Sequence, residues 1–290
     1  MKNFKQQTLS LIIAIITIFN LTAQNNPNTN LWKVEGDSIK TSYLFGTIHI
    51  LPKKDFKLSD RVKKAFDSCN KIALEIDMGD PNFAKEAMRL SQLKEGENLS
   101  QYMDEDEYKL LDNFLKENLK MGLDLFNKFK PITLMSIIMM AKYKDEPFAS
   151  YEMSFIEMSK AVNKEMEGLE TFEDQMKAID SQPYDEQIDT YIEMIEDSEE
   201  TDKEYKNLLN LYLAENVDGL YNIMLEIMDG DAELLKKILD DRNNKWIPKF
   251  AEYSKEKSVF YAVGAAHLGG DQGVISLLKK AGYKLTPILD

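Results

Sequence analysis

Two histidines stand in the same short pattern near opposite ends of the chain. The stretch "LFGTIH" ends with His49 and "AVGAAH" ends with His267, and the 290 residues contain no other histidine. In both, an apolar, strand-like run ends in glycine and the histidine follows three positions later. Glycine frees the backbone to bend after the strand, and a histidine there can be a metal ligand, a general base or a nucleophile. A hydrogen-bonded structural histidine is the alternative, but the repetition favours one shared site.

A catalytic metal site generally takes three protein ligands and keeps a further position open for water. Glu75 is the best third candidate because it interrupts an otherwise apolar strand end, where an ionised carboxylate needs a cation or a charged partner. Glu170 is similarly placed at the end of a short strand. Arg242 and Asn243 are expected at the close of an acidic amphipathic helix, where an arginine is either a salt-bridge partner or a clamp for an oxyanion. Each carboxylate also has a purely structural interpretation, as a capping or salt-bridge group.

The elements that must position these groups look β-rich at the two ends of the chain. Strands are predicted at residues 32–35, 41–45, 71–77, 258–263 and 283–288. Short helices are predicted at residues 59–66 and 274–281. The order strand, helix, strand indicates a parallel α/β unit, and the carboxyl edge of such a sheet is where ligands usually bind.

The middle of the chain, roughly residues 82–251, has the apolar period of amphipathic helices. Within it, "PITLMSIIMMAKY" is apolar nearly all round and predicts a buried helix, too short to cross a bilayer. Residues 164–170 interrupt the helical pattern and predict a short strand that returns to the sheet. The fold class is therefore α/β (α+β), with a central mixed β-sheet built from N- and C-terminal segments and a large helical middle region.

The first residues of the chain have the pattern of a secretory signal. Lys2 and Lys5 precede an apolar run, and a small residue precedes a plausible cut near Gln24. Residues 1–23 are therefore predicted to be a signal peptide and residues 24–290 the mature domain. We expect the mature chain to be periplasmic or extracellular, with no stable membrane insertion beyond the signal segment.

Composition excludes some partners. Lys and Arg total 36 against 50 Asp and Glu, a net charge of −14. Such a surface repels nucleic acid and anionic lipid, so neither is an expected partner. Cys69 is the only cysteine, which rules out an internal disulfide and favours a buried core residue.

The motifs together resemble a known family. "LFGTIH", "ALEID", "GLETFEDQ", "DDRNNKWIP" and "FYAVGAAHLGGDQGVISLLKKAGYKL" are similar, in the same order, to the TraB/GumN family, which includes pheromone-shutdown proteins and the TIKI proteases that act on secreted Wnt. The resemblance implies an α/β core related to the erythromycin-esterase and haem-binding ChaN groups. Through the TIKI members it also implies divalent-metal-dependent peptide cleavage, with manganese or cobalt as the ion; we expect manganese, cobalt or zinc in this chain.

Carried onto this chain, the resemblance implies a site whose ligands are His49, Glu75 and His267. Glu170, Arg242 and Asn243 are then the supporting groups. Family members often have a glycine before an acidic residue at the start of the helix preceding "GLE"; here Glu152 can fill the acidic role, but the glycine is absent.

Three functions fit these observations. The first is an exported metal-dependent hydrolase acting on peptide or protein substrates. The second is a metal-free, esterase-like hydrolase that uses the same turns, with one histidine activating water and a carboxylate orienting it. The third is a non-catalytic binding protein for a peptide, a pheromone or haem. Metal content and activity after chelation separate the first two, and product formation separates both from the third.

Overall fold

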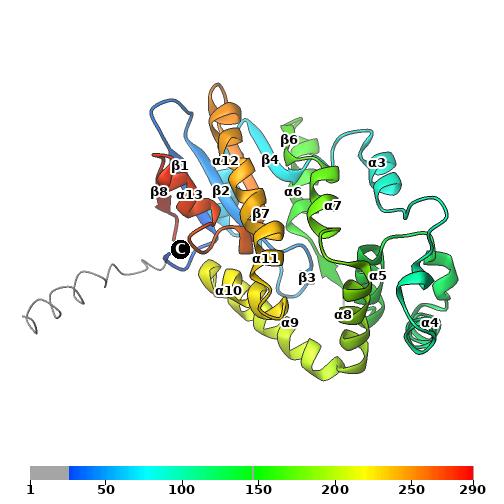
Figure 1. Ribbon diagram of the computed structural model, residues 1–290. Coiled ribbons are helices and arrows are strands. Elements are labelled where there is room, and N and C mark those ends of the chain that lie inside the picture. Colours follow the sequence, from blue (N-terminus) through cyan, green and yellow to red (C-terminus); the bar gives the residue numbers. More distant parts are fainter. Residues whose placement is uncertain (1–25, 146, 290) are drawn as a thin grey trace, which may run out of the picture.

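The protein is built around a six-stranded mixed sheet with the strand order β6-β4-β7-β2-β1-β8 (Figure 1). A computed structural model describes residues 26–145 and 147–289, so the predicted signal peptide lies outside the described residues. The strands of this sheet are β1 (Leu31–Glu35), β2 (Ser42–Thr47), β4 (Lys71–Ile76), β6 (Glu165–Glu170), β7 (Val259–Gly264) and β8 (Lys284–Pro287). A separate antiparallel pair joins β3 (Leu51–Pro52) to β5 (Phe148–Ala149).

Strands from the two ends of the chain are interleaved in the sheet. β7 lies between β2 and β4 and is parallel to both. β6 pairs in parallel with β4 at one edge, whereas β1 is antiparallel to both β2 and β8. The predicted α/β fold with a central mixed sheet is confirmed. The strand–helix–strand unit formed by β2, α2 (Asp60–Asp67) and β4 is parallel as expected, but β7 separates its two strands.

Helices occupy most of the chain between β4 and β7, interrupted by β5 and β6. Helix α2 (Asp60–Asp67) precedes β4 and α13 (Val274–Lys280) follows β7. The helices between them are α3 (Phe83–Leu90), α4 (Glu105–Leu119), α5 (Pro131–Lys142), α6 (Tyr151–Ala161), α7 (Phe172–Ile179), α8 (Tyr184–Glu196), α9 (Ser198–Leu213), α10 (Val217–Ile227), α11 (Ala232–Leu235) and α12 (Asp241–Ser254). Shorter turns are η1 (Leu99–Tyr102), η2 (Leu123–Phe126), the π-helical η3 (Lys236–Asp240) and η4 (Ala265–His267). Among the described residues, no helix is both long and apolar enough to span a membrane.

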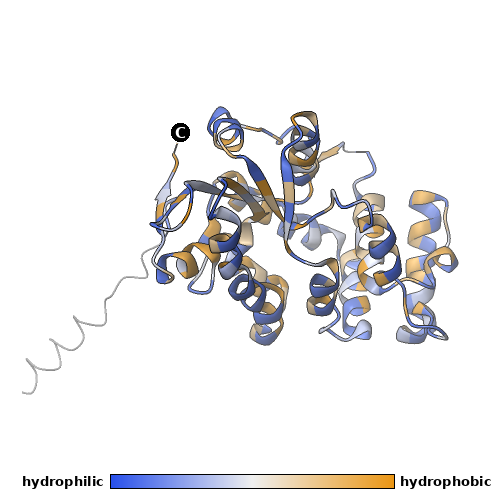
Figure 2. Ribbon diagram, turned by 90° about the horizontal axis from the view of Figure 1, so that it is seen from above, coloured by the Kyte–Doolittle hydropathy of each residue, from blue (hydrophilic) through white to orange (hydrophobic). Residues whose placement is uncertain are grey.

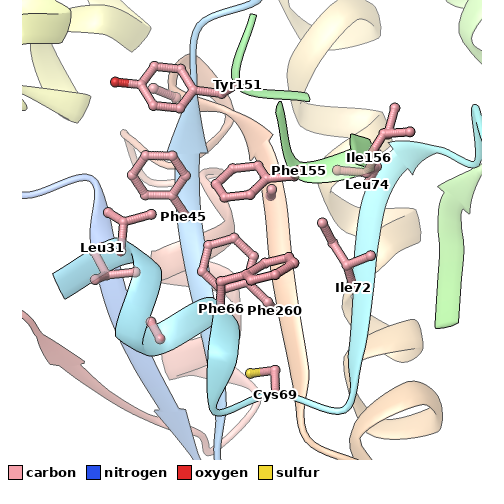
Figure 3. Close-up of a cluster of buried hydrophobic side chains, with 14 of the residues drawn as sticks. Leu31, Phe45, Phe66, Cys69, Ile72, Leu74, Tyr151, Phe155, Ile156 and Phe260 are labelled. Atoms are coloured by element: carbon pink, nitrogen blue, oxygen red, sulfur yellow. The ribbon is translucent and has the colours of Figure 1, made fainter. Parts of the chain in front are cut away.

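The sheet is covered on both faces because its buried strands carry apolar side chains on both faces. In β7, Phe260 and Ala262 join one core cluster, and Tyr261 and Val263 join another on the opposite face. Figure 3 shows the first cluster, where Phe260 meets aromatic side chains from the sheet, α2 and α6. Burial of each large apolar side chain contributes about 1.5 to 3 kcal/mol to folding. Cys69 is buried in the same cluster, as predicted.

A third core cluster lies in the helical middle region, away from the sheet. Residues of α4, α5 and α8 form it together with Leu99 of η1 and Leu123 of η2, and Figure 1 shows the three helices to one side of the sheet. Figure 2 shows hydrophobic and hydrophilic residues on opposite sides of several helices. The predicted buried helix α5 is buried on one side only, because Leu134 and Ile138 are buried while Met140 is 62% exposed. α5 packs against α4 and α8 on one side, and the side carrying Met140 is open.

Candidate functional site

The carboxyl ends of four parallel strands meet at one edge of the sheet. Thr47 at the end of β2 is in register with Gly264 at the end of β7. Ile76 at the end of β4 is in register with Glu170 at the end of β6. Because β7 is also paired with β4, the residues that end or follow these strands are brought together. The two histidine turns and both strand-end glutamates therefore lie at this edge.

Gly264 is the point around which the predicted ligands gather. A β-carbon built on this glycine would lie 3.2 Å from Glu75 Oε1, 3.5 Å from His267 Cδ2 and 3.8 Å from His49 Nε2. The structure therefore brings the two histidines, from opposite ends of the chain, to one place with Glu75. A glycine at position 264 leaves the space between the three side chains open.

The second glycine of the repeated pattern has a packing role. A β-carbon on Gly46 would lie 2.9 Å from Ala265 Cβ and 3.0 Å from Ala265 Cα. Such approaches are shorter than ordinary van der Waals contact, so only glycine lets the turn after β7 pack directly on β2. The two Gly-x-x-His segments thus share one pattern but use their glycines differently.

His267 is buried and held by α12. Its Nδ1 lies 2.6 Å from Asn243 Oδ1, and Asn243 Nδ2 donates to the carbonyl oxygen of Gln272 at 2.9 Å. Since the Asn243 amide oxygen faces the ring, Nδ1 carries the hydrogen and Nε2 presents a lone pair. Burial lowers the pKa of His267 to about 3, against the opposing effect of Glu75. His267 is therefore neutral at physiological pH, with its ring 4.5 Å from that of Trp246 between centroids.

Arg242 links the two strand-end carboxylates. Its Nη2 donates to Glu75 Oε2 at 2.7 Å and to Glu170 Oε1 at 2.5 Å, and its Nε donates to Glu170 Oε1 at 3.0 Å. Nη1 donates to the carbonyl oxygen of Ile238 at 2.8 Å and lies 3.2 Å from His267 Nε2. The arginine and both carboxylates are buried, so this is a charge network that excludes water.

The two carboxylates of this network differ in their tendency to ionise. Burial raises the pKa of Glu75, but the charges of His267 and Arg242 more than offset this and lower it to about 2. Because His267 is itself neutral above about pH 3, Arg242 and the protonated His49 are the cations that keep Glu75 ionised near neutral pH. The backbone N–H of Gly264 also donates to Glu75 Oε1, at 2.7 Å. For Glu170, burial outweighs the contacts with Arg242 and raises the pKa.

The placement of Arg242 and Asn243 corrects the sequence prediction. They lie in the first turn of α12 and not at the close of a helix. The π-helical segment η3 comes directly before them, and its wider turn changes the direction in which following side chains point. Arg242, Asn243 and Trp246, all buried, therefore face the sheet edge from one side of α12.

His49 has a more open setting than His267. Its Nδ1 lies 2.9 Å from Glu152 Oε1 in α6, and 65% of its side chain is exposed. Desolvation lowers the pKa of His49, but the hydrogen bond and charge of Glu152 outweigh it and raise the pKa to about 9. With so much of the ring in contact with water, the desolvation is partial and the Glu152 contact decides the direction.

Three further residues at this edge were not predicted. Thr47 Oγ1 donates to Glu152 Oε1 at 2.5 Å, Gln175 Nε2 donates to Glu75 Oε2 at 3.3 Å, and Trp246 Nε1 donates to Glu170 Oε2 at 3.3 Å. All three lie inside the motifs that carry the family resemblance. The spacing of residues within these motifs does not reveal which side chains point toward the site. The sequence therefore contains no signal that could have identified these three.

The donor chemistry at this edge suits a divalent metal ion. Two imidazole nitrogens and a carboxylate oxygen are ligands that zinc, manganese and cobalt accept. Among the described residues, no three His, Cys, Asp or Glu side chains are yet close enough together to hold an ion. His267 Nε2 accepts from Arg242 in this arrangement, so ion binding requires that this contact be exchanged.

Known proteins resemble this chain over different lengths. The TraB/PrgY/gumN family profile matches residues 30–287. Metalloprotease TIKI2 of Xenopus tropicalis is 33% identical over 96 residues, and Metalloprotease TIKI1 of the same species is 33% identical over 95. Each match covers 32% of this chain and 18% of the relative. Since the family profile spans nearly all of the described residues, the chain belongs to the TraB/PrgY/gumN family.

Proposed function

We propose that this protein is an exported, metal-dependent hydrolase that acts on peptide or protein substrates. One observation carries the proposal: each histidine has its Nδ1 bound to an outer oxygen, of Glu152 or of Asn243. This leaves both Nε2 atoms toward Gly264 and Glu75. Metal-binding histidines commonly have this second-shell arrangement, which fixes the ring and the tautomer.

In this proposal His49 Nε2, Glu75 and His267 Nε2 are the protein ligands. Because the pKa of His49 is raised to about 9, His49 must release its Nε2 proton when it binds the ion. A manganese, cobalt or zinc ion held by these residues would supply Lewis-acid chemistry, lowering the pKa of water and polarising the substrate carbonyl. Glu75 is suited to be a ligand because its carboxylate stays ionised down to about pH 2. Asn243 holds His267 in the tautomer whose Nε2 carries the lone pair, which becomes available to an ion once the contact with Arg242 is exchanged.

The remaining buried groups stabilise charge and accept a proton. Arg242 lies beside Glu75 and His267, where its guanidinium can stabilise negative charge that develops on the carbonyl oxygen. Glu170 holds Arg242 in place by accepting three hydrogen bonds from its guanidinium. Because burial raises the pKa of Glu170, it accepts a proton more readily than Glu75.

One contact favours metal-free hydrolysis as a second candidate. Arg242 Nη1 already occupies the lone pair of His267 Nε2 at 3.2 Å. In that function one histidine activates water without a metal and a glutamate orients it. Chelation separates the two candidates, since metal-free hydrolysis survives it.

Substrate class and export rest on different observations. The relatives at 33% identity are named metalloproteases, and the matched stretch is 18% of their length, so a peptide or protein substrate is the corresponding proposal for this chain. Export rests on the signal-like residues 1–23. Cell fractionation and N-terminal sequencing test it, and the expected mature chain begins near Gln24.

The metal proposal is tested by elemental analysis of the purified protein. We expect about one Mn, Co or Zn per chain in the wild type and none in His49→Ala or His267→Ala. Asn113→Ala, an exposed change on α4, is the matched control and keeps the metal. Full metal retention in both histidine variants contradicts the proposal. Peptide cleavage that persists after exhaustive chelation favours the metal-free function.

A further inference from the structure

Three side chains converge on the buried carboxylate of Glu152. Thr47 Oγ1 donates to Oε1 at 2.5 Å, and His49 Nδ1 lies 2.9 Å from the same oxygen. Ser150 Oγ donates to the other oxygen, Oε2, at 2.8 Å. Glu152 is only 8% exposed, and a buried carboxylate with three hydrogen-bonding partners is fixed in direction.

The backbone brings these distant residues together. β3 begins at Leu51, shortly after His49, and pairs with β5, which comes just before Glu152; Leu51 is opposite Ala149 in this pair. Ser150 is also the N-cap of α6, accepting the N–H of Met153. The start of α6 is therefore attached to the histidine turn by strand pairing, although His49 and Glu152 are 103 residues apart in the chain.

An outer acceptor matters more for His49 than for His267. The His267 ring is enclosed by the core, with Trp246 against one side. The His49 side chain is 65% exposed, so little packing restrains its ring and water competes for both nitrogens. Among the described contacts, the Glu152 carboxylate is the group that binds Nδ1 and directs Nε2 inward.

We infer that Glu152 is a positioning residue: it holds the Nδ1–H of His49 so that Nε2 faces Glu75 and His267, and Thr47 and Ser150 hold its carboxylate in place. The inference rests on the proposed function in one respect, that His49 Nε2 is the atom that binds the ion. Asn243 has the same role for His267. It binds the ring through a neutral amide oxygen, whereas Glu152 binds His49 through a charged carboxylate.

Nitrogen-15 NMR of histidine-labelled protein tests the hydrogen bond directly. The chain has two histidines, so two sets of ring signals are expected. In metal-free wild type, the Nδ1–H proton of His49 should be strongly deshielded and slow to exchange with water. Glu152→Ala should remove that signal and leave the His267 signals unchanged, whereas Glu152→Gln, which keeps an oxygen acceptor, should retain it. Glu157→Gln, an exposed change on the same helix, is the matched control.

Zn²⁺ titration by calorimetry supplies the second readout. Loss of an outer-shell partner of a metal-binding histidine typically weakens metal binding about 10- to 100-fold. We expect a loss of this size for Glu152→Ala, a smaller one for Glu152→Gln, and none for Glu157→Gln. If Glu152→Ala does not fold, as judged by circular dichroism, Thr47→Val replaces it. Removal of that one donor should speed exchange of the His49 Nδ1–H proton and weaken Zn²⁺ binding severalfold.

The outcomes distinguish this inference from the proposed function. A His49 Nδ1–H signal that persists in folded Glu152→Ala overturns the positioning role, as does Zn²⁺ affinity unchanged from the wild type. If the wild type binds no metal, the metal-dependent function fails. In that case loss of the signal in Glu152→Ala, with retention in Glu152→Gln, still supports the positioning role.

Discussion

The two histidine turns have the same sequence pattern and opposite environments. His267 is buried, bound to the neutral amide of Asn243, and its pKa is lowered to about 3. His49 is open to solvent, bound to the carboxylate of Glu152, and its pKa is raised to about 9. A repeated motif therefore predicts where two imidazoles lie but not their protonation. Solvent exclusion and the charge of the outer partner decide that property.

The two turns also depend on different helices. α12 supplies Arg242, Asn243 and Trp246 to the His267 side. α6 supplies Glu152 to the His49 side. Perturbation of one helix should therefore affect one turn and spare the other, which makes the comparison testable.

The largest expected effect comes from Arg242→Leu, which breaks the network on the His267 side. The change leaves Glu75 and Glu170 buried without their cationic partner. Removal of one member of a buried ion pair costs about 3 to 5 kcal/mol. Urea denaturation should show a fall of this size in the free energy of unfolding.

Arg89→Ala is the control for this loss. Arg89 is exposed in α3 and pairs with Glu86 at 3.9 Å, so its removal should change stability by less than about 0.5 kcal/mol. In Arg242→Leu the His49 Nδ1–H signal should persist, because α6 is untouched. Equal losses for the two arginine variants contradict the assigned role of the network.

The second prediction concerns the pH dependence of stability in metal-free protein. The unfolded pKa of histidine is about 6.5, above that of folded His267, about 3. The unfolded state therefore binds the extra proton, and the stability that neutral His267 contributes is present above about pH 6.5 and lost as pH falls toward 3. For His49 the folded pKa, about 9, is the higher. Its contribution is present below about pH 6.5 and lost as pH rises through about 9.

Unfolding free energies between pH 4 and pH 10 check this contrast. The His267 contribution is on the order of a few kcal/mol, whereas that of His49 is smaller because water screens an exposed pair. His267→Gln should flatten the acid side of the profile, and His49→Gln the alkaline side. If both variants change the same side, the assigned protonation states are wrong.

The smallest expected effects on stability come from alanine substitutions at the two glycines. In Gly46→Ala the new methyl group meets the backbone of Ala265 at 3.0 Å, and such overpacking costs about 1 to 3 kcal/mol. In Gly264→Ala the nearest atom is Glu75 Oε1, at 3.2 Å, and a side chain yields more easily, so the cost should stay below about 1 kcal/mol. Thermal unfolding measures both.

Zn²⁺ titration sharpens the comparison of the glycines. Gly264→Ala fills the space between His49, Glu75 and His267 and should weaken ion binding more than Gly46→Ala does. The reverse order of metal affinities would place the ion elsewhere.

Much of the fold could be predicted from the sequence because strand and helix patterns are local. The run Val259–Val263 is β-branched and aromatic, and its two faces carry side chains of two separate core clusters. The order of strands was not predictable in the same way. β7 lies between β2 and β4, and the choice of partner among similar apolar strands depends on how the whole chain packs.

The sequence predicted which residues form the site better than it predicted the contacts between them. His49, His267 and Glu75 stand out by position in the sequence, and the structure gathers them around Gly264. Glu152 was noticed as an acidic residue without an assigned partner, because that partner is 103 residues away. Arg242 was expected at a helix end, since a π-helical turn has no clear sequence pattern.

The sequence by itself determined which functional groups are available. These are two imidazoles that follow strands ending in glycine, and a carboxylate at the end of an apolar strand that needs a positively charged partner. Those properties depend on residue type and near neighbours. Only the tertiary structure decided that one imidazole is neutral in the core and the other lies beside a carboxylate in the open. The reason is physical: protonation depends on excluded water and nearby charge, and both are supplied here by helices from distant parts of the chain.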